Sequence, residues 1–138
     1  MKIEILEGSD AEVKQELIDR VRAFNTAAIG EAEIHPLTVI ARDEDDALIG
    51  GVSGRTICGH YLIEVVWVAE SVRGQGLGAK LMNEAERRAR ELGCYGAQVD
   101  TVSFQAPGFY EKLGFRVIGT VEDFPRGHAR HFLQKDYS

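Results

Sequence analysis

Three glycines at alternate positions, Gly74, Gly76 and Gly78, follow an apolar run and precede a helical pattern. Glycine lets the backbone approach a ligand closely, and the first amides of a helix are unpaired donors at the positive end of its dipole. This turn therefore predicts a site for an anion such as phosphate or pyrophosphate. A turn without a ligand is the alternative, but glycine costs a helix about 1 kcal/mol per residue, which favours a functional reason.

The spacing of the turn differs from the two common nucleotide motifs. Its pattern is G-x-G-x-G, whereas dinucleotide-binding folds use G-x-G-x-x-G. A P-loop requires Ser or Thr after its lysine, but Lys80 is followed by Leu81. Neither motif therefore identifies the anion.

Glu64 is the strongest candidate for a general base. It is the one charged residue in the apolar run from Tyr61 to Val68. A carboxylate in such a strand is costly to bury unless it is paired, hydrated or functional. Burial would suit a base, because desolvation favours the form that carries the proton. The alternative is a glutamate that faces solvent or forms a structural ion pair.

Other polar residues give weaker signals. His128, His131 and the neighbouring arginines could line an acceptor site or a dimer contact, although alternation favours a solvated strand edge. Cys58 and Cys94 lack the CxxC spacing of a zinc site and are expected to be small buried hydrophobes. No cluster of His, Cys and Asp has metal-ligand spacing, so no metal is expected.

Periodicity predicts the elements that position these residues. A helix begins at the capping box Ser9-Asp10-Ala11-Glu12 and ends at Gly30, and two more helices follow over 77–92 and 107–113. Strands are predicted over 2–6, 37–41, 47–57, 61–68, 96–102, 115–121 and 129–134. The strand, glycine turn, helix and next strand form a right-handed crossover between parallel strands. The expected fold is a mixed α/β sheet of about six to seven strands with helices on both faces.

Composition limits the function classes. A chain of 138 residues with 44% hydrophobic and 28% charged residues is expected to form one globular domain over 1–138. The net charge of −6 argues against nucleic acid, and no apolar run is long enough for a membrane span. Two cysteines fit a protein of the reducing cytoplasm. Residues 1–70 hold 6 basic and 14 acidic side chains, which would favour a cationic partner.

Two motifs together resemble the GNAT superfamily of acetyl-coenzyme A dependent N-acetyltransferases. The run Arg73-x-x-Gly76-x-Gly78 after an apolar strand resembles motif A of that family. Further on, the family has Asn-x-x-Ala-x-x-x-Tyr followed by Gly-Phe. This sequence has Ser103-x-x-Ala106-x-x-x-Tyr110, then Gly114-Phe115, so serine stands at the asparagine position. The order of elements is also similar, and the resemblance covers nearly the whole chain.

The resemblance implies a site for acetyl-coenzyme A. The strand at 61–68 would bulge and splay from the strand at 96–102, and the pantetheine arm would enter the gap beside Val66, Trp67 and Val68. Ser103 and Ala106 would lie along the same arm. The family asparagine contacts the pantetheine arm or the acceptor, and with Ser103 in its place that contact would be shortened or lost. The pyrophosphate would be held by the turn, namely Arg73, Gly74, Gln75, Gly76, Leu77 and Gly78.

The resemblance also implies a mechanism. Acetyl would pass to a primary amine by direct attack in a ternary complex, with Glu64 as base, directly or through water. Tyr110 would protonate the leaving thiolate, and the amide of Val68 would stabilise the oxyanion. A cationic acceptor is expected, either a small molecule such as a polyamine or aminoglycoside-like amine, or a peptide or protein amine. A non-catalytic acyl-coenzyme A binding or sensing domain is the alternative, and an interaction scaffold is a further one. A homodimer is left open.

Overall fold

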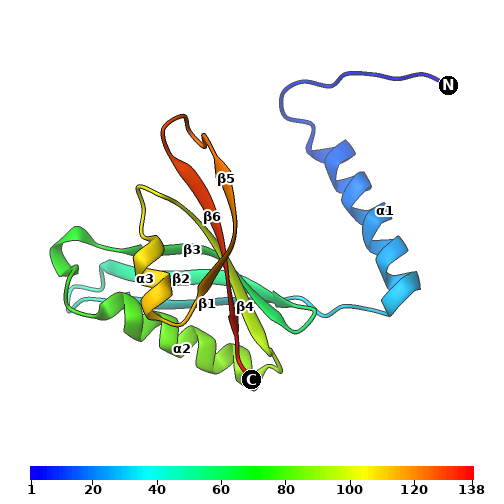
Figure 1. Ribbon diagram of the computed structural model, residues 1–138. Coiled ribbons are helices and arrows are strands. Elements are labelled where there is room, and N and C mark those ends of the chain that lie inside the picture. Colours follow the sequence, from blue (N-terminus) through cyan, green and yellow to red (C-terminus); the bar gives the residue numbers. More distant parts are fainter. The chain divides into compact units, whose positions relative to one another are not determined.

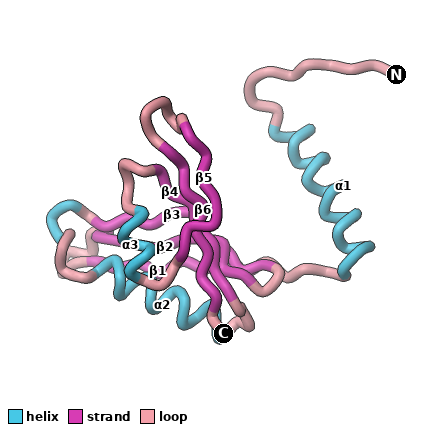
Figure 2. The backbone as a smooth tube through the Cα atoms, in the orientation of Figure 1, coloured by secondary structure: helices cyan, strands magenta, loops and turns pink.

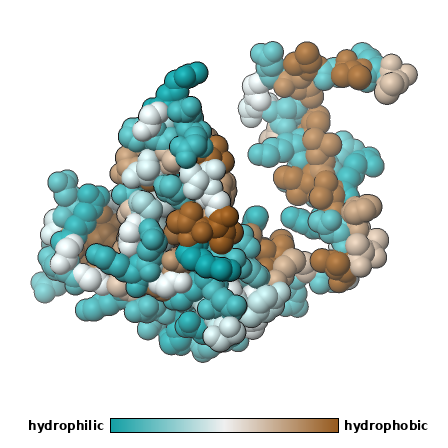
Figure 3. Space-filling view, viewed as in Figure 1, coloured by the Kyte–Doolittle hydropathy of each residue, from teal (hydrophilic) through white to brown (hydrophobic).

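The computed structural model describes all 138 residues, which divide into two compact units, residues 1–32 and 33–138. The first unit holds one helix, α1 (Ala11–Ile29), and none of its residues is buried. Apolar side chains follow one another along α1 in Figure 3, and Val13, Leu17 and Val21 are all exposed.

Two local predictions for this unit are wrong. The side chain that caps α1 is Asp10 rather than Ser9, because its carboxylate accepts a hydrogen bond from the amide of Val13 at 3.3 Å. Residues 2–6 form no strand, although their alternation suits one. A strand needs a partner for its backbone groups, and no strand pairs with this segment.

The second unit is built on a six-stranded sheet in the order β1-β2-β3-β4-β6-β5 (Figures 1 and 2). All neighbouring strands are antiparallel except β3 and β4, which are parallel as predicted. The strands are β1 (His35–Arg42), β2 (Leu48–Ile57), β3 (His60–Val68), β4 (Gly96–Val102), β5 (Arg116–Glu122) and β6 (Ala129–Asp136). The mixed sheet and the parallel crossover confirm the predicted fold class. The expectation of helices on both faces is wrong for this unit, because its two helices pack into one core on the same face.

Two helices cover one face of this sheet. A short 3-10 turn (Glu70–Val72) precedes α2 (Leu77–Glu91), which packs against β1, β2 and β3. The second helix, α3 (Pro107–Lys112), lies against β5. Both helices contribute to one core, which includes Met82 of α2 and Tyr110 of α3 together with Leu133 of β6. Burial of this apolar area fixes the ends of β3, β4 and α2 relative to one another.

A bulge in β3 changes the direction of the side chains in the second half of the strand. Ser53 of β2 pairs with Val65 and the next residue, Gly54, pairs with Ile63, so Glu64 is an extra residue with no partner. The strands approach so closely here that a Cβ on Gly54 would lie 2.1 Å from the carbonyl oxygen of Leu62. After the bulge, Val66 lies on the helix-covered face, where it packs against the core.

Candidate active site

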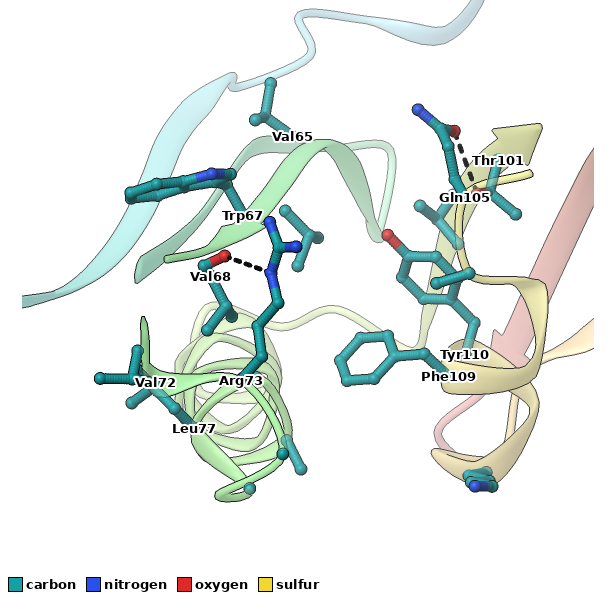
Figure 4. Close-up of a pocket in the computed structure, with 18 of the residues that line it drawn as sticks. Val65, Trp67, Val68, Val72, Arg73, Leu77, Thr101, Gln105, Phe109 and Tyr110 are labelled. Atoms are coloured by element: carbon teal, nitrogen blue, oxygen red, sulfur yellow. Dashed lines mark hydrogen bonds between the residues drawn. The ribbon is translucent and has the colours of Figure 1, made fainter. Parts of the chain in front are cut away.

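A cavity opens where β3 and β4 diverge. These strands pair over only three residues each, His60–Leu62 with Gly96–Gln98, although both continue well beyond. The gap that follows has a volume of about 930 Å³ (Figure 4). Its walls come from the second halves of β3 and β4, the start of α2, and the loop and helix at 104–112. The splay predicted between 61–68 and 96–102 is therefore confirmed.

The glycine turn forms one end of this cavity. Gly74 and Gly76 adopt left-handed backbone with φ of +79° and +80°, which side chains rarely tolerate. The first intrahelical hydrogen bond runs from the amide of Lys80 to the carbonyl of Gly76, so the amides of Leu77, Gly78 and Ala79 have no intrahelical acceptor. Free amides at the positive end of a helix dipole suit a phosphate group.

Gly78 has a packing role as well. A Cβ at this position would lie 3.0 Å from the ring of Phe109 on α3. A larger residue at this position would require the Phe109 ring to shift, so glycine favours the close approach of α2 and α3. On the opposite side of the turn, the Arg73 Nε donates a hydrogen bond of 3.0 Å to the carbonyl oxygen of Val68 (Figure 4). This bond ties the turn to the end of β3.

Tyr110 points its hydroxyl into the cavity from α3 (Figure 4). The residue is 7% exposed, and its ring packs edge-on against Phe109 and Phe115. Burial raises the pKa of the Tyr110 phenol, and the negative charge of Asp100 raises it further. The hydroxyl therefore stays protonated at neutral pH and can donate a hydrogen bond or a proton into the cavity.

Glu64 lines the cavity at the bulge of β3. Its side chain is 57% exposed, and Arg55 Nε lies 3.9 Å from its Oε1. The carboxylate is therefore not buried, and both features of the alternative interpretation, exposure to solvent and an ion pair, are present. The bulge breaks the alternation of the strand and turns Glu64 out of the core.

Most of the predicted coenzyme contacts line the cavity. Two do not: Gln75 and Ser103. The Ser103 hydroxyl instead accepts a hydrogen bond of 3.0 Å from the amide of Ala129 and lies 3.5 Å from His128 Nδ1, so it fastens its loop to β6. The residues that do line it are Val66, Trp67, Val68, Arg73, Gly74, Gly76, Leu77, Gly78, Ala106 and Tyr110.

Asp100 is a cavity residue that sequence reasoning missed. It lies on β4, and its Oδ2 accepts a hydrogen bond of 2.9 Å from Arg130 Nε on β6. Its position in the alternating pattern of β4 indicated only a solvent-facing side chain. The predicted splay could have identified Asp100, because a residue on the diverging part of β4 faces the cavity instead of the neighbouring strand β3.

The cysteines differ from each other. Cys94 is buried as expected, but Cys58 is exposed, in the tight turn between β2 and β3. No group of three or more His, Cys, Asp or Glu side chains is placed to hold a metal ion. None of the helices has the length and apolar character that a bilayer crossing requires.

The splayed sheet, the glycine turn at the start of α2 and the buried phenol are the features expected from the resemblance to acetyl-coenzyme A dependent acetyltransferases. Residues 5–115 match the model of the acetyltransferase (GNAT) family. The chain is 39% identical over 128 residues to blasticidin-S acetyltransferase from Streptomyces morookaense, covering 90% of this chain and 93% of that protein. The chain therefore belongs to the acetyltransferase (GNAT) family, as its two motifs indicated.

Solved structures agree with this assignment. The crystal structure of an acetyltransferase from Bacillus cereus superposes with a TM-score of 0.88 at 34% identity, over 96% of this chain and 97% of that one. A structure from Bacillus anthracis, determined in complex with acetyl coenzyme A, shares the fold with a TM-score of 0.66 at 22% identity, over 75% of this chain and 63% of that one.

Proposed function

We propose that this acetyltransferase moves acetyl from acetyl-coenzyme A to a primary amine by direct attack in a ternary complex. One observation carries the proposal: a single cavity joins the glycine turn at 73–78 to Glu64 and Tyr110. An anion site, a carboxylate and a protonated phenol are the groups that such a transfer needs.

The residues present fit the coenzyme. The free amides after Gly76 and the left-handed turn suit a pyrophosphate, and nothing lies within 4 Å of a Cβ built on Gly74 or Gly76. Arg73 and Lys112 add positive charge to the same cavity. The β3 edge that faces the gap has backbone groups freed by the splay, which suit the amides of a pantetheine arm.

Acetyl-coenzyme A would supply the acetyl group as an activated thioester. The amine attacks the thioester carbonyl, so a C–N bond forms and an oxyanion develops, and the C–S bond breaks when that oxyanion collapses. The amine must therefore lose a proton, and the leaving thiolate must gain one or be stabilised. Glu64 takes the amine proton, directly or through water, since its exposed carboxylate is open to solvent. The Tyr110 hydroxyl donates to the sulfur, and the amide of Val68 is the donor assigned to the oxyanion.

Charge along the cavity favours a cationic acceptor. Its charged lining residues are Arg73 of the glycine turn, Lys112 of α3, and Glu64 and Asp100 on the two diverging strands. A protonated amine would be drawn toward the carboxylates before it is deprotonated. A non-catalytic acyl-coenzyme A sensor would need only the glycine turn, and so does not account for a protonated phenol and an acid-lined gap beside it.

The test is acetyl transfer to a panel of primary amines, read by mass spectrometry of the products. Transfer that needs both Glu64 and Tyr110 supports the enzyme. Coenzyme binding with no transfer to any amine would favour the sensor. Three further statements stay predictions: that residues 1–138 form a single functional domain, that the protein forms a homodimer, and that it is cytoplasmic.

A further inference from the structure

Glu64 and Asp100 occupy corresponding positions on β3 and β4, just beyond the point where the two strands diverge. Leu62 and Gln98 are the last paired residues of β3 and β4. Glu64 and Asp100 lie two residues beyond them, one on each strand, and both line the cavity. The hydroxyl of Tyr110, which has no protein partner and belongs to a side chain 7% exposed, points into the same space (Figure 4).

Arg130 holds the second carboxylate in place. Its Nε donates to Asp100 Oδ2 at 2.9 Å, and its guanidinium lies 4.7 Å and 5.3 Å from the ring centroids of Phe132 and Phe124. These contacts fix the arginine from three sides. Asp100 Oδ1 has no protein partner, and the side chain is 44% exposed. One carboxylate oxygen is thus restrained while the other remains available.

The arginines themselves lie outside the cavity. Neither Arg55, beside Glu64, nor Arg130, beside Asp100, contributes to its lining. Glu64 and Asp100 therefore contribute to the cavity lining at this end, whereas their two arginine partners do not.

We propose that Asp100 binds a second positively charged group of the acceptor, while Glu64 serves the amine that is acetylated. The acceptor would then be a diamine, a polyamine or another compound with two cationic groups. Arg130 is a positioning residue that acts through Asp100. This inference rests on the proposed acetyl transfer and adds that the acceptor carries two cationic groups.

The spacing of the strands sets the size of the acceptor. Paired strands lie about 4.8 Å apart, and the gap widens beyond Leu62 and Gln98, so two cationic groups separated by a short chain can reach both carboxylates. A monoamine can use only one of them. The second contact is a charge-assisted hydrogen bond at a partly exposed site, which corresponds to about a tenfold gain in kcat/KM.

The experiment compares diaminoalkanes of increasing length with monoaminoalkanes of the same length, in the full chain with acetyl-coenzyme A. The selectivity is the ratio of kcat/KM for the diamine to that for the monoamine. We expect a ratio of about ten or more at the best length, collapsing toward one in Asp100→Asn. Asp100→Glu should restore part of it, and Arg130→Gln should lower it less than Asp100→Asn does.

A matched control separates a site effect from a change in net charge. Glu122→Gln removes an exposed carboxylate at the end of β5, which does not line the cavity, and should leave the selectivity ratio unchanged. The inference about Asp100 would be overturned if the wild type transfers acetyl with a selectivity ratio near one, or if Asp100→Asn has the same ratio as the wild type. Either result would leave the proposed acetyl transfer standing. No transfer to any amine would overturn the proposed function itself.

Discussion

Glu64 and Asp100 stand on diverging strands, each two residues beyond the last paired residue, and both face one cavity. The relationship depends on the splay, because regular pairing would bring the two strands together and close the gap. It also depends on the bulge at Glu64, which turns that side chain out of the core. This end of the cavity is therefore a product of two irregularities in the sheet.

Glu64→Gln should lower kcat by about a hundredfold or more at neutral pH, because the amide cannot take a proton from the amine. Coenzyme binding should be unchanged, since the glycine turn lies at the other end of the cavity. Steady-state kinetics with an accepted amine, together with calorimetry, check both. Wild-type turnover in this variant would remove Glu64 from the mechanism.

Tyr110→Phe should lower kcat by about ten- to a hundredfold, because the leaving thiolate loses a hydrogen-bond donor. The ring packs against Phe109 and Phe115, so phenylalanine preserves the fold and the unfolding midpoint should change little. Phe109→Leu is the matched control, since it alters the same packing without removing a hydroxyl. Equal losses of kcat in the two variants would assign Tyr110 to packing alone.

Stability should fall at alkaline pH because of Tyr61. Burial, with smaller contributions from the charges of Glu64 and Glu86, raises the pKa of this fully buried phenol to about 12. The folded state then holds its proton more tightly than the unfolded chain, whose tyrosines ionise near 10. The free energy of unfolding should be steady below about pH 10 and fall by about 2 to 3 kcal/mol as the pH approaches 12.

Urea denaturation at a series of pH values checks this. Tyr61→Phe should flatten the alkaline fall, while raised pKa values at Tyr110 and Tyr137 leave a residual slope. At neutral pH this variant should lose about 1 kcal/mol, because the Tyr61 hydroxyl donates a 3.0 Å hydrogen bond to the carbonyl of Leu37. An unchanged alkaline slope in Tyr61→Phe would contradict the assignment.

A buried ion pair connects α2 to β6. Lys135 Nζ lies 3.1 Å from Oε2 of Glu86, whose side chain is 1% exposed. Lys135→Met leaves that carboxylate buried and unpaired, so it should cost about 3 to 5 kcal/mol of stability. The double variant Glu86→Leu with Lys135→Met should recover most of the loss, because no charge then remains buried.

The exposed pair Arg87 and Glu84, on the same helix, provides the control. Arg87→Met should change the unfolding midpoint little, since solvent screens the pair. If the double variant lost as much stability as the sum of the Glu86→Leu and Lys135→Met losses, the two residues would not be coupled as a buried pair.

Sequence periodicity predicted nearly all the elements of residues 33–138, because most of them place an apolar face against the core; β5, which has no buried residue, is an exception. The segment at 2–6 shows the limit of that reasoning: its alternation suits a strand, but pairing is a long-range property that alternation does not encode. Glu64 shows another limit, since a bulge is visible only in the register of two strands. Asp100 was missed because its function comes from the divergence of β4 from β3.

Calorimetry of acetyl-coenzyme A binding measures whether the turn at 73–78 holds the coenzyme. The comparison is between wild type, Gly76→Glu and Gly93→Glu. Both glycines have positive φ, +80° and +95°, and open space beyond the Cβ, so both variants carry similar backbone strain. Only Gly76 lines the cavity.

We predict that the wild type and Gly93→Glu bind the coenzyme alike, whereas Gly76→Glu loses binding because a carboxylate repels the pyrophosphate. Retained binding in a folded Gly76→Glu variant, or no binding by the folded wild type, would show that this turn does not hold the coenzyme.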